Sequence, residues 1–331
     1  MRVVMMGTGL FAEPTFEALL KRPGLVVGLV TQPDRPVGEK RGSTRQTGRG
    51  MKEIALTHNI PVLQPESINT PEGVEQLRSL RPDLLVVSAY GQILSNEVLS
   101  VPPLGGINVH ASLLPKYRGA APVAWAIWKG EIRTGVTIIR MSAGLDAGDM
   151  LAQEALDVLP GETAGELEAR LAPLGAKLAM SVIERLEKGP VQGVKQDPAL
   201  VTKAPKLKKE WGLIDWSKPA DEVSNQIKAM QPWPTAYTFL HRPGTQPLRT
   251  IINVACAHPV RYDPSVPPGK PFVDADMPHS LYVTAGLLDP EERSVVEVFE
   301  LQPASKKRMS AAEFLRGNPI KEGDLFGPEV M

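Results

Sequence analysis

Residues 107–149 read INVHASLLPKYRGAAPVAWAIWKGEIRTGVTIIRMSAGLDAGD, and this stretch decides the fold. It begins with a short apolar strand that carries Asn108 and His110. A turn rich in Pro, Arg and Gly follows, and then an apolar helix, a second strand and Asp146 in a loop bracketed by glycines. Because a polar side chain on a buried strand costs free energy unless it is paired, the stretch predicts where the chain does its chemistry.

Asn108 and His110 are two residues apart on the predicted strand, so their side chains share one face. An Asn amide donates a hydrogen bond to a developing oxyanion, and a His moves a proton near neutral pH or stabilises the same charge as imidazolium. Asp146 is suited to orient that His or to position a water for proton transfer. A structural alternative stays open, because a strand His is often a satisfied core residue and an Asp beside Gly is often a turn former.

The Asn-His-Asp pattern contains no Ser, Cys or Lys nucleophile. The metal-ligand spacings H-x-x-x-H and C-x-x-C are also missing from the sequence, so no metal is expected. The pattern therefore predicts direct attack of a substrate nucleophile on a carbonyl, with oxyanion stabilisation and proton transfer by the three side chains.

The chain before this stretch alternates between strand and helix patterns. Buried-strand runs lie at 2–6, 26–31 and 84–88, with helical segments between them. This alternation predicts an α/β fold with a Rossmann-like, mostly parallel, doubly wound sheet. Ligands bind outside the carboxyl ends of strands in such sheets. The turn formed by Tyr90, Gly91, Gln92 and Ile93 is therefore expected beside Asn108 and His110.

The second half of the chain has a different pattern. Short strand-like segments are separated by Pro and Gly clusters, which predicts a small OB-like β-barrel; they lie at 236–240, 248–254, 281–284 and 294–301. A length of 331 residues favours two domains over one. We expect a catalytic domain over 1–188, a linker over 189–209, a barrel domain over 210–317 and a tail over 318–331.

The segment Gly7-Thr8-Gly9-Leu10-Phe11-Ala12 follows a strand and precedes a helix, which is the spacing of the dinucleotide fingerprint. The second strand, however, ends in Gln32-Pro33-Asp34 and lacks an acid at its tip to hold a ribose. A tight strand-to-helix turn is therefore the favoured interpretation. A nicotinamide-dependent dehydrogenase remains as an alternative.

Charge is balanced overall, with 37 Lys and Arg against 37 Asp and Glu. Net charge thus gives no indication of a polyanionic partner, and any such indication rests on local patches. The basic loop, residues 35–52, has six basic residues and one acid. It is either a solvated surface loop or an arm that grips phosphate when RNA binds.

The single cysteine, Cys256, excludes an internal disulfide and fits a reducing compartment. The amino terminus MRVVMMG is too short for a signal-peptide core, and no apolar run approaches the ~18 residues of a membrane span. We expect a cytoplasmic monomer without a membrane partner.

The central stretch resembles the folate-dependent formyltransferase family through N-V-H-A-S-L-L-P-K-Y-R-G-A-A-P and G-L-D-A-G-D. The resemblance covers both halves of the chain and is strongest to members that formylate methionyl-tRNA. The further motifs that carry it are Thr31-Gln-Pro-Asp-Arg-Pro36, Pro61-Val-Leu-Gln-Pro-Glu66, Ser88-Ala-Tyr-Gly-Gln92, Ala204-Pro-Lys-Leu207, Ile214-Asp-Trp216, Pro232-Trp-Pro234 and Lys307-Arg-Met-Ser310.

The resemblance implies 10-formyltetrahydrofolate as formyl donor and the amino group of methionyl initiator tRNA as acceptor. It implies a catalytic triad of Asn108, His110 and Asp146 in a formyltransferase fold, with a C-terminal barrel that helps to hold the tRNA. It also implies a folate site along Ser112, Leu113, Leu114 and Pro115, with the pterin near Tyr90, Gly91, Gln92 and Ile93. The residues expected to bind tRNA are Arg41, Arg45, Arg49, Lys206, Lys208 and Lys209.

Some positions depart from the family pattern. The basic loop lacks the usual ending S-P-V-K, and Ser142-Ala143 replaces the usual acids before the G-L-D motif. From Lys203 onward, basic and acidic residues balance, so the barrel domain is neutral. Two alternatives remain besides the dehydrogenase: a formyltransferase for a small amine, which has no need of the basic loop, and an RNA-binding module, which leaves the triad unexplained.

Overall fold

The computed structural model describes residues 1–34, 50–289 and 292–330. The chain forms two compact units, and each draws on several segments. The first unit comprises Met1–Val123, Ile132–Val158 and Glu166–Lys206. The second comprises Ala124–Glu131, Leu159–Gly165 and Leu207–Met331. The domain boundaries expected from the sequence remain a prediction.

The first unit is built on one sheet of seven strands, in the order β3-β2-β1-β4-β5-β6-β7. The strands β3 to β5 in that order pair in parallel, and β6 and β7 continue the sheet antiparallel. Their bounds are β1 Val3–Gly7, β2 Val26–Val30, β3 Val62–Leu63, β4 Leu84–Ser88, β5 Gly106–His110, β6 Arg133–Arg140 and β7 Met150–Asp157. The predicted mostly parallel α/β sheet is confirmed.

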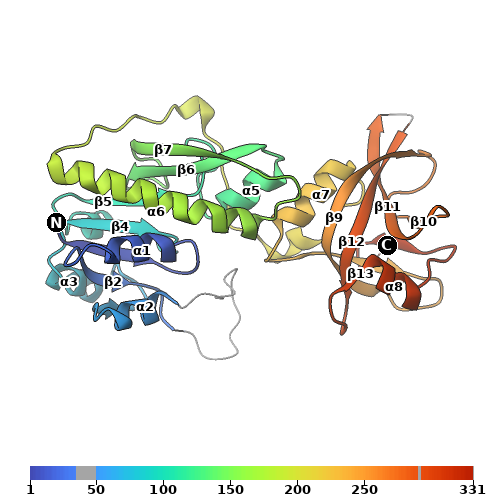
Figure 1. Ribbon diagram of the computed structural model, residues 1–331, viewed down its shortest axis with the longest axis horizontal. Helices are drawn as coiled ribbons and strands as arrows, with labels where there is room; N and C mark the ends of the chain where they lie inside the picture. Colours follow the sequence, from blue (N-terminus) through green and yellow to red (C-terminus); the bar gives the residue numbers. More distant parts are fainter. Residues whose placement is uncertain (35–49, 290–291, 331) are drawn as a thin grey trace. The chain divides into compact units, whose positions relative to one another are not determined.

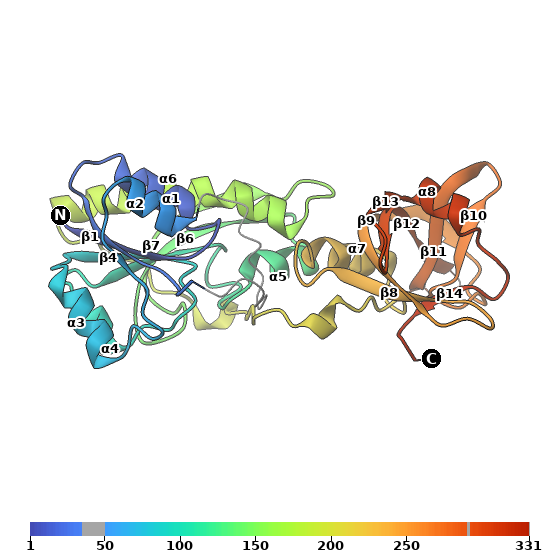
Figure 2. The same ribbon diagram turned by 90° about the horizontal axis from the view of Figure 1, so that it is seen from below.

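Helices cover both faces of this sheet. Figure 2 shows α1, α2 and α6 on one side and α3 and α4 on the other. The bounds are α1 Glu13–Leu20, α2 Met51–Thr57, α3 Pro71–Ser79, α4 Asn96–Leu99 and α6 Ala164–Lys188. The long helix α6 runs without a break through Pro173. Two residues later it approaches the sheet closely, because a Cβ added at Gly175 would lie 2.7 Å from Val109.

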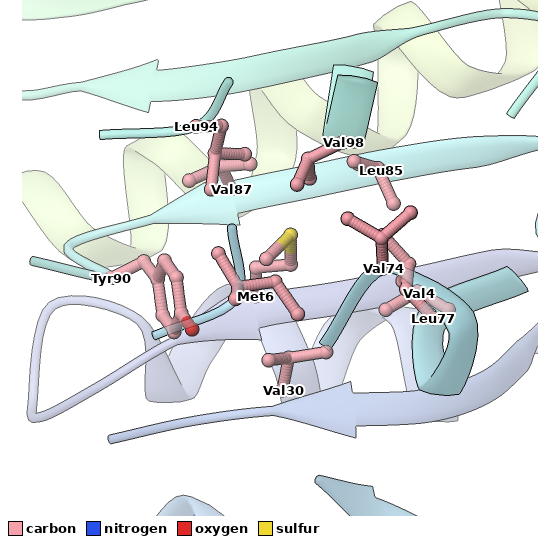
Figure 3. Close-up of a cluster of buried hydrophobic side chains, with 11 residues drawn as sticks. Val4, Met6, Val30, Val74, Leu77, Leu85, Val87, Tyr90, Leu94 and Val98 are labelled. Carbon is pink, nitrogen blue, oxygen red and sulfur yellow. The ribbon is translucent and has the colours of Figure 1, made fainter. Parts of the chain in front are cut away.

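A cluster of buried apolar side chains packs next to the carboxyl ends of the strands and holds these strand ends in place. Figure 3 shows Met6, Val30, Val87 and Tyr90 in one buried cluster between the strands and α3. Two of these strands, β1 and β4, also touch through their ends. A Cβ added at Gly7 would lie 2.9 Å from the carbonyl oxygen of Ser88. The glycines that imitate a dinucleotide fingerprint are thus explained in part by close sheet packing.

The second unit contains an antiparallel β-sheet that forms a half-barrel, which confirms the predicted β-domain. Its strands pair in the order β10-β11-β12-β9-β8-β14, and β13 pairs with β12. They are β8 Ala236–His241, β9 Leu248–Tyr262, β10 Pro271–Asp274, β11 Met277–Asp289, β12 Glu292–Pro303, β13 Met309–Ser310 and β14 Leu325–Gly327. The helix α7, Ala220–Ala229, packs on β9 (Figure 1). The helix α8, Ala311–Gly317, begins with a capping box formed by Ser310 and Glu313.

Three tryptophans form a ring cluster within the second unit. Trp125 and Trp128 lie on α5, Pro122–Trp128, and their ring centroids are 4.9 Å apart. Trp211 lies in a 3₁₀ turn, Lys209–Gly212, and its ring meets both at 5.5 and 5.9 Å in edge-on geometry. All three side chains are half-buried. The cluster therefore joins a helix from the middle of the chain to the segment that leads into the half-barrel.

Among the described residues, no helix combines the length and the apolar character that crossing a bilayer requires.

Candidate active site

Asn108 and His110 lie at the carboxyl end of β5, at the edge where the parallel part of the sheet meets its antiparallel part. Asn108 is opposite Val87 on β4 and Ile139 on β6, and His110 is opposite Thr137. Because the two residues alternate with Val109, their side chains leave the strand on the same face. The site is therefore held by paired backbone on both sides.

The Asp146 carboxylate brings the three predicted residues together. Its Oδ1 accepts a hydrogen bond from Asn108 Nδ2 at 3.2 Å, and its Oδ2 accepts one from the Gly119 backbone N–H at 2.9 Å. Oδ2 also lies 3.6 Å from His110 Nδ1. The side chains of His110 and Asp146 are 5% and 11% exposed, so the contact between them lies in a poorly solvated environment.

The other ring nitrogen of His110 is tied to the backbone. Its Nε2 lies 3.0 Å from the carbonyl oxygen of Tyr117. A carbonyl only accepts hydrogen bonds, so Nε2 carries the proton in this contact. The Nδ1 edge is left to face Asp146, and this edge is the part of the ring positioned for chemistry.

Close backbone packing shapes the turn that follows β5. Gly119 has a φ of +128°, and a Cβ added there would lie 2.5 Å from the carbonyl oxygen of Ala204. The absence of a side chain is therefore required at this position. It lets the Gly119 N–H reach Asp146.

The segment from Ser112 to Pro115 is anchored by two polar side chains of the antiparallel strands. Thr137 on β6 donates to the carbonyl oxygen of Ser112 at 2.7 Å and accepts from the Leu114 N–H at 3.1 Å. Gln153 on β7 donates to the Leu114 carbonyl at 2.9 Å. Ser112 and Leu114 are buried, and Leu113 and Pro115 are half-buried. The segment is thus a fixed ledge with two partly accessible side chains.

The turn from Tyr90 to Ile93 presents backbone more than side chains. Tyr90 is 2% exposed, and burial raises the pKa of its phenol to about 12. Gln92 uses its amide to fix the turn, because Oε1 accepts from the Ile68 N–H and Nε2 donates to the Glu66 carbonyl. Gly91 and Ile93 are exposed.

Two residues of the site were missed in the sequence, and both come from the stretch at 189–209. Gln196 is 9% exposed and donates from Nε2 to the backbone carbonyls of Asp146 and Gly148. Thr202 accepts from the Tyr117 N–H at 2.8 Å. The stretch has no helix or strand periodicity, so its sequence carries no signal that separates the buried Gln196 or the exposed Thr202 from other loop residues.

The predicted tRNA contacts fall into two groups. Arg41, Arg45 and Arg49 lie outside the described residues. Lys206, Lys208 and Lys209 are exposed on the segment that ends in Trp211. Lys208 Nζ lies 5.5 Å from the centroid of the Trp211 ring, which is cation–π geometry.

The arrangement has the parts of a carbonyl-transfer site without a metal-binding cluster among the described residues. An amide donor, an imidazole and a carboxylate converge, and a fixed ledge and an open turn lie at the same carboxyl edge of the sheet. Such a set stabilises an oxyanion and moves a proton. It therefore fits formyl transfer by direct attack.

Family models match both halves of the chain. The model described as "Formyl transferase" matches residues 1–183, and the one described as "Formyl transferase, C-terminal domain" matches residues 206–319. The first match contains Asn108, His110 and Asp146. The second match contains the half-barrel strands β8 to β13 and the three exposed lysines.

Solved structures share the fold. WlaRD, a sugar 3N-formyl transferase solved in the presence of dTDP and 5-N-formyl-THF, gives a TM-score of 0.64 at 16% identity, over 93% of this chain and 99% of that one. An N-formyltransferase from Helicobacter canadensis, solved with folinic acid and dTDP-3-aminofucose, gives 0.64 at 17% identity, over 89% and 98%. At these identities the likeness concerns the fold alone.

Curated relatives match over the whole length. Methionyl-tRNA formyltransferase of Trichlorobacter lovleyi is 42% identical over 327 residues, which cover 99% of this chain and 97% of that protein. The enzyme of the same name from Bacillus subtilis is 40% identical over 326 residues, which cover 98% of each. With both family models in place, these matches confirm the resemblance seen in the sequence: the chain belongs to the methionyl-tRNA formyltransferase family.

Proposed function

We propose that this enzyme transfers the formyl group of 10-formyltetrahydrofolate to the amino group of methionyl initiator tRNA in the cytoplasm. The observation that carries the proposal is the Asp146 carboxylate, which holds Asn108 at 3.2 Å and lies 3.6 Å from His110. Names of full-length relatives support the acceptor, and solved formyltransferases with bound folates support the donor. The ledge at 112–115 and the turn at 90–93 are the proposed folate contacts.

Asn108 is the proposed oxyanion donor. A carboxamide has two N–H donors, and Asp146 takes one of them. The second N–H has no hydrogen-bond partner among residues 1–34, 50–289 and 292–330, and we propose that it points at the oxygen of the formyl group as the amine attacks. Since the first bond fixes the amide plane, the second donor is held in place before the reaction, which is what gives such donors their effect.

His110 and Asp146 are the proposed proton carriers. With Nε2 committed to the Tyr117 carbonyl, the Nδ1 edge exchanges the proton or, as imidazolium, adds positive charge beside the oxyanion. Asp146 lies beside this edge and holds the orientation of the ring. In balance, the amine nitrogen bonds to the formyl carbon, the bond from that carbon to N10 breaks, and the proton lost by the amine passes to N10.

The acceptor end of the tRNA requires positive charge on the enzyme. Lys206, Lys208 and Lys209 supply it among the described residues, and we keep Arg41, Arg45 and Arg49 as further proposed contacts. The neutral second half of the chain makes local lysines, and not the net charge of the domain, the proposed source of phosphate binding.

The test is formyl transfer from 10-formyltetrahydrofolate to charged initiator tRNA, with charged elongator tRNA and free methionine as control acceptors. We expect transfer to initiator tRNA alone. The Asn108→Ala variant should lose about 10²–10³-fold in kcat, which is the usual cost of one oxyanion donor. Circular dichroism checks that the variant folds.

Two outcomes contradict the proposal. Equal transfer to a free small amine would assign the site to a different acceptor. An unchanged kcat in a folded Asn108→Ala variant would remove the amide from the mechanism, whatever the acceptor.

A further inference from the structure

The side chain of Gln196 forms two hydrogen bonds to the backbone of the loop that carries Asp146. Its Nε2 donates to the Asp146 carbonyl at 2.7 Å and to the Gly148 carbonyl at 2.8 Å. Its Oε1 accepts from Arg118 Nε and Nη2 at 3.0 and 2.8 Å. The carboxamide thus has both donors and its acceptor in use, and the residue is 9% exposed.

Arg118 determines which way this amide points. An arginine only donates, so the oxygen of Gln196 must face Arg118 and the nitrogen must face the two carbonyls. Arg118 is itself fixed through its backbone, because its N–H donates to the Thr202 carbonyl at 2.9 Å and its carbonyl accepts from the Ala204 N–H at 2.7 Å. The donor pair of Gln196 is therefore oriented in advance.

The loop needs such a support. Residues 142–145 and 147 are exposed, so little packing holds them. Asp146 has a φ of +48°, in the left-handed region that residues other than glycine seldom adopt. A backbone in that conformation persists only when surrounding contacts hold it. The two bonds of Gln196 hold the backbone directly after this position, at the carbonyl of Asp146 itself and at the carbonyl of Gly148 two residues later.

We propose that Gln196 is a positioning residue for formyl transfer, which holds the Asp146 carboxylate against His110 and Asn108. The inference rests on the function proposed above, since it assigns Asp146 a part in the reaction. Without the amide donors, the loop relaxes toward ordinary backbone angles. The carboxylate then spends less time within reach of the imidazole, and a displacement of about 1 Å at a reacting group costs about 10²-fold in rate.

Two substitutions separate the acceptor of the amide, which faces Arg118, from its donors, which face the two carbonyls. Gln196→Ala removes the acceptor and the donors. Gln196→Glu keeps an acceptor for Arg118 but turns a carboxylate toward the two carbonyl oxygens. We expect both variants to fold and to lose about 10²-fold in kcat, with KM for 10-formyltetrahydrofolate within a few-fold of the parent. Retention of full kcat by Gln196→Glu would overturn the inference, because it would show that the Arg118 contact alone suffices.

A double-mutant cycle supplies the readout that a merely structural role would not move. If Gln196 acts through Asp146, then Gln196→Ala costs nothing further in the Asp146→Ala background. Full additivity of the two losses would overturn the inference. The matched control is Asp197→Ala, which removes an exposed neighbour that only caps the turn at Ala199 and should leave kcat unchanged.

The cycle also separates this inference from the proposed function. If Asp146→Ala alone leaves formyl transfer intact, the catalytic part of the proposed function fails. If Asp146→Ala is slow and Gln196→Ala is as fast as the parent, only the positioning role fails.

Discussion

Tyr90 shows how one residue can belong to a predicted site and still serve the core. Its ring is part of the apolar cluster in Figure 3. Its hydroxyl has no hydrogen-bond partner among the described residues. The raised pKa of the phenol has the same cause, because burial disfavours the charged form. Burying the hydroxyl therefore lowers the free energy of unfolding, and no hydrogen bond to a described residue offsets that cost.

Tyr90→Phe should stabilise the enzyme. Removing a buried, unpaired hydroxyl relieves a desolvation cost of about 1 kcal/mol by mutational scales. The ring and its packing stay the same. Urea denaturation of the parent and the variant measures the change in the free energy of unfolding.

The same variant tests the proposed folate contact of the turn at residues 90–93. If backbone and the exposed Gly91 and Ile93 make the contacts, KM for 10-formyltetrahydrofolate stays as in the parent. A several-fold rise in KM would mean that the Tyr90 hydroxyl reaches the folate, and a loss of stability would mean that it has a partner in the folded enzyme.

At the scale of elements, helix α6 carries an ionisable side chain, Glu168, in a partly desolvated position that disfavours its charged form. Glu168 is half-buried on this helix, and burial raises the pKa of its carboxyl. The folded protein therefore binds this proton more tightly than the unfolded chain. Its contribution to stability is favourable at low pH and is lost as the pH rises through the raised pKa.

Glu168→Gln should raise Tm at about pH 7, where the parent must bury a charge, and change it little at about pH 4, where the parent carboxyl is protonated. Glu184→Gln, an exposed position on the same helix, is the control and should show no such pH-dependent gain. Scanning calorimetry of the parent and both variants at the two pH values measures these changes in Tm. A lower Tm for Glu168→Gln at neutral pH would show that the charge has a favourable partner.

The elements also show what the sequence could predict. Apolar runs such as 84–88 matched buried strands, because a strand covered on both faces is a continuous hydrophobic signal. The edge strand β7 was missed, because Met150–Asp157 mixes polar and apolar residues and most of its positions are half-buried or exposed. The strands of the half-barrel are longer than predicted for the same reason: β9 and β11 extend their apolar centres into exposed ends.

The candidate site was predictable to the same degree. Asn108, His110 and Asp146 stand out as polar residues in strand and turn patterns, and the structure brings them together. Gln196 could not be found this way. Its role depends on where an aperiodic segment passes in space, and neither residue type nor spacing encodes that path.

For the whole molecule, the balanced charge means that the proposed tRNA binding depends on small groups of basic residues. The described lysines at 206, 208 and 209 are exposed, and Lys208 Nζ also lies 3.8 Å from the Glu210 carboxylate. Lys208 is also held near the Trp211 ring, so its side chain has less freedom to lose on binding.

Replacing Lys206, Lys208 and Lys209 by Ala should weaken tRNA binding and reduce the slope of log K against log salt by about one for each phosphate that a lysine no longer neutralises. Filter binding at several salt concentrations measures that slope. Lys177→Ala, on α6, is the control with an unchanged slope. Weaker binding with the parent slope would mean that the lysines support the fold of the segment and do not contact phosphate.

The chain passes between its two compact units five times, at 123, 131, 158, 165 and 206, so no single cleavage divides them. A fragment ending at Lys206 would retain residues 124–131 and 159–165 but lose the rest of the unit to which they belong. It would leave the indoles of Trp125 and Trp128 without Trp211, as an apolar patch in water prone to aggregation. Because the two units are interleaved in this way, a gene fusion at a single point cannot exchange either unit intact. We therefore expect the two units to be inherited together and degraded together.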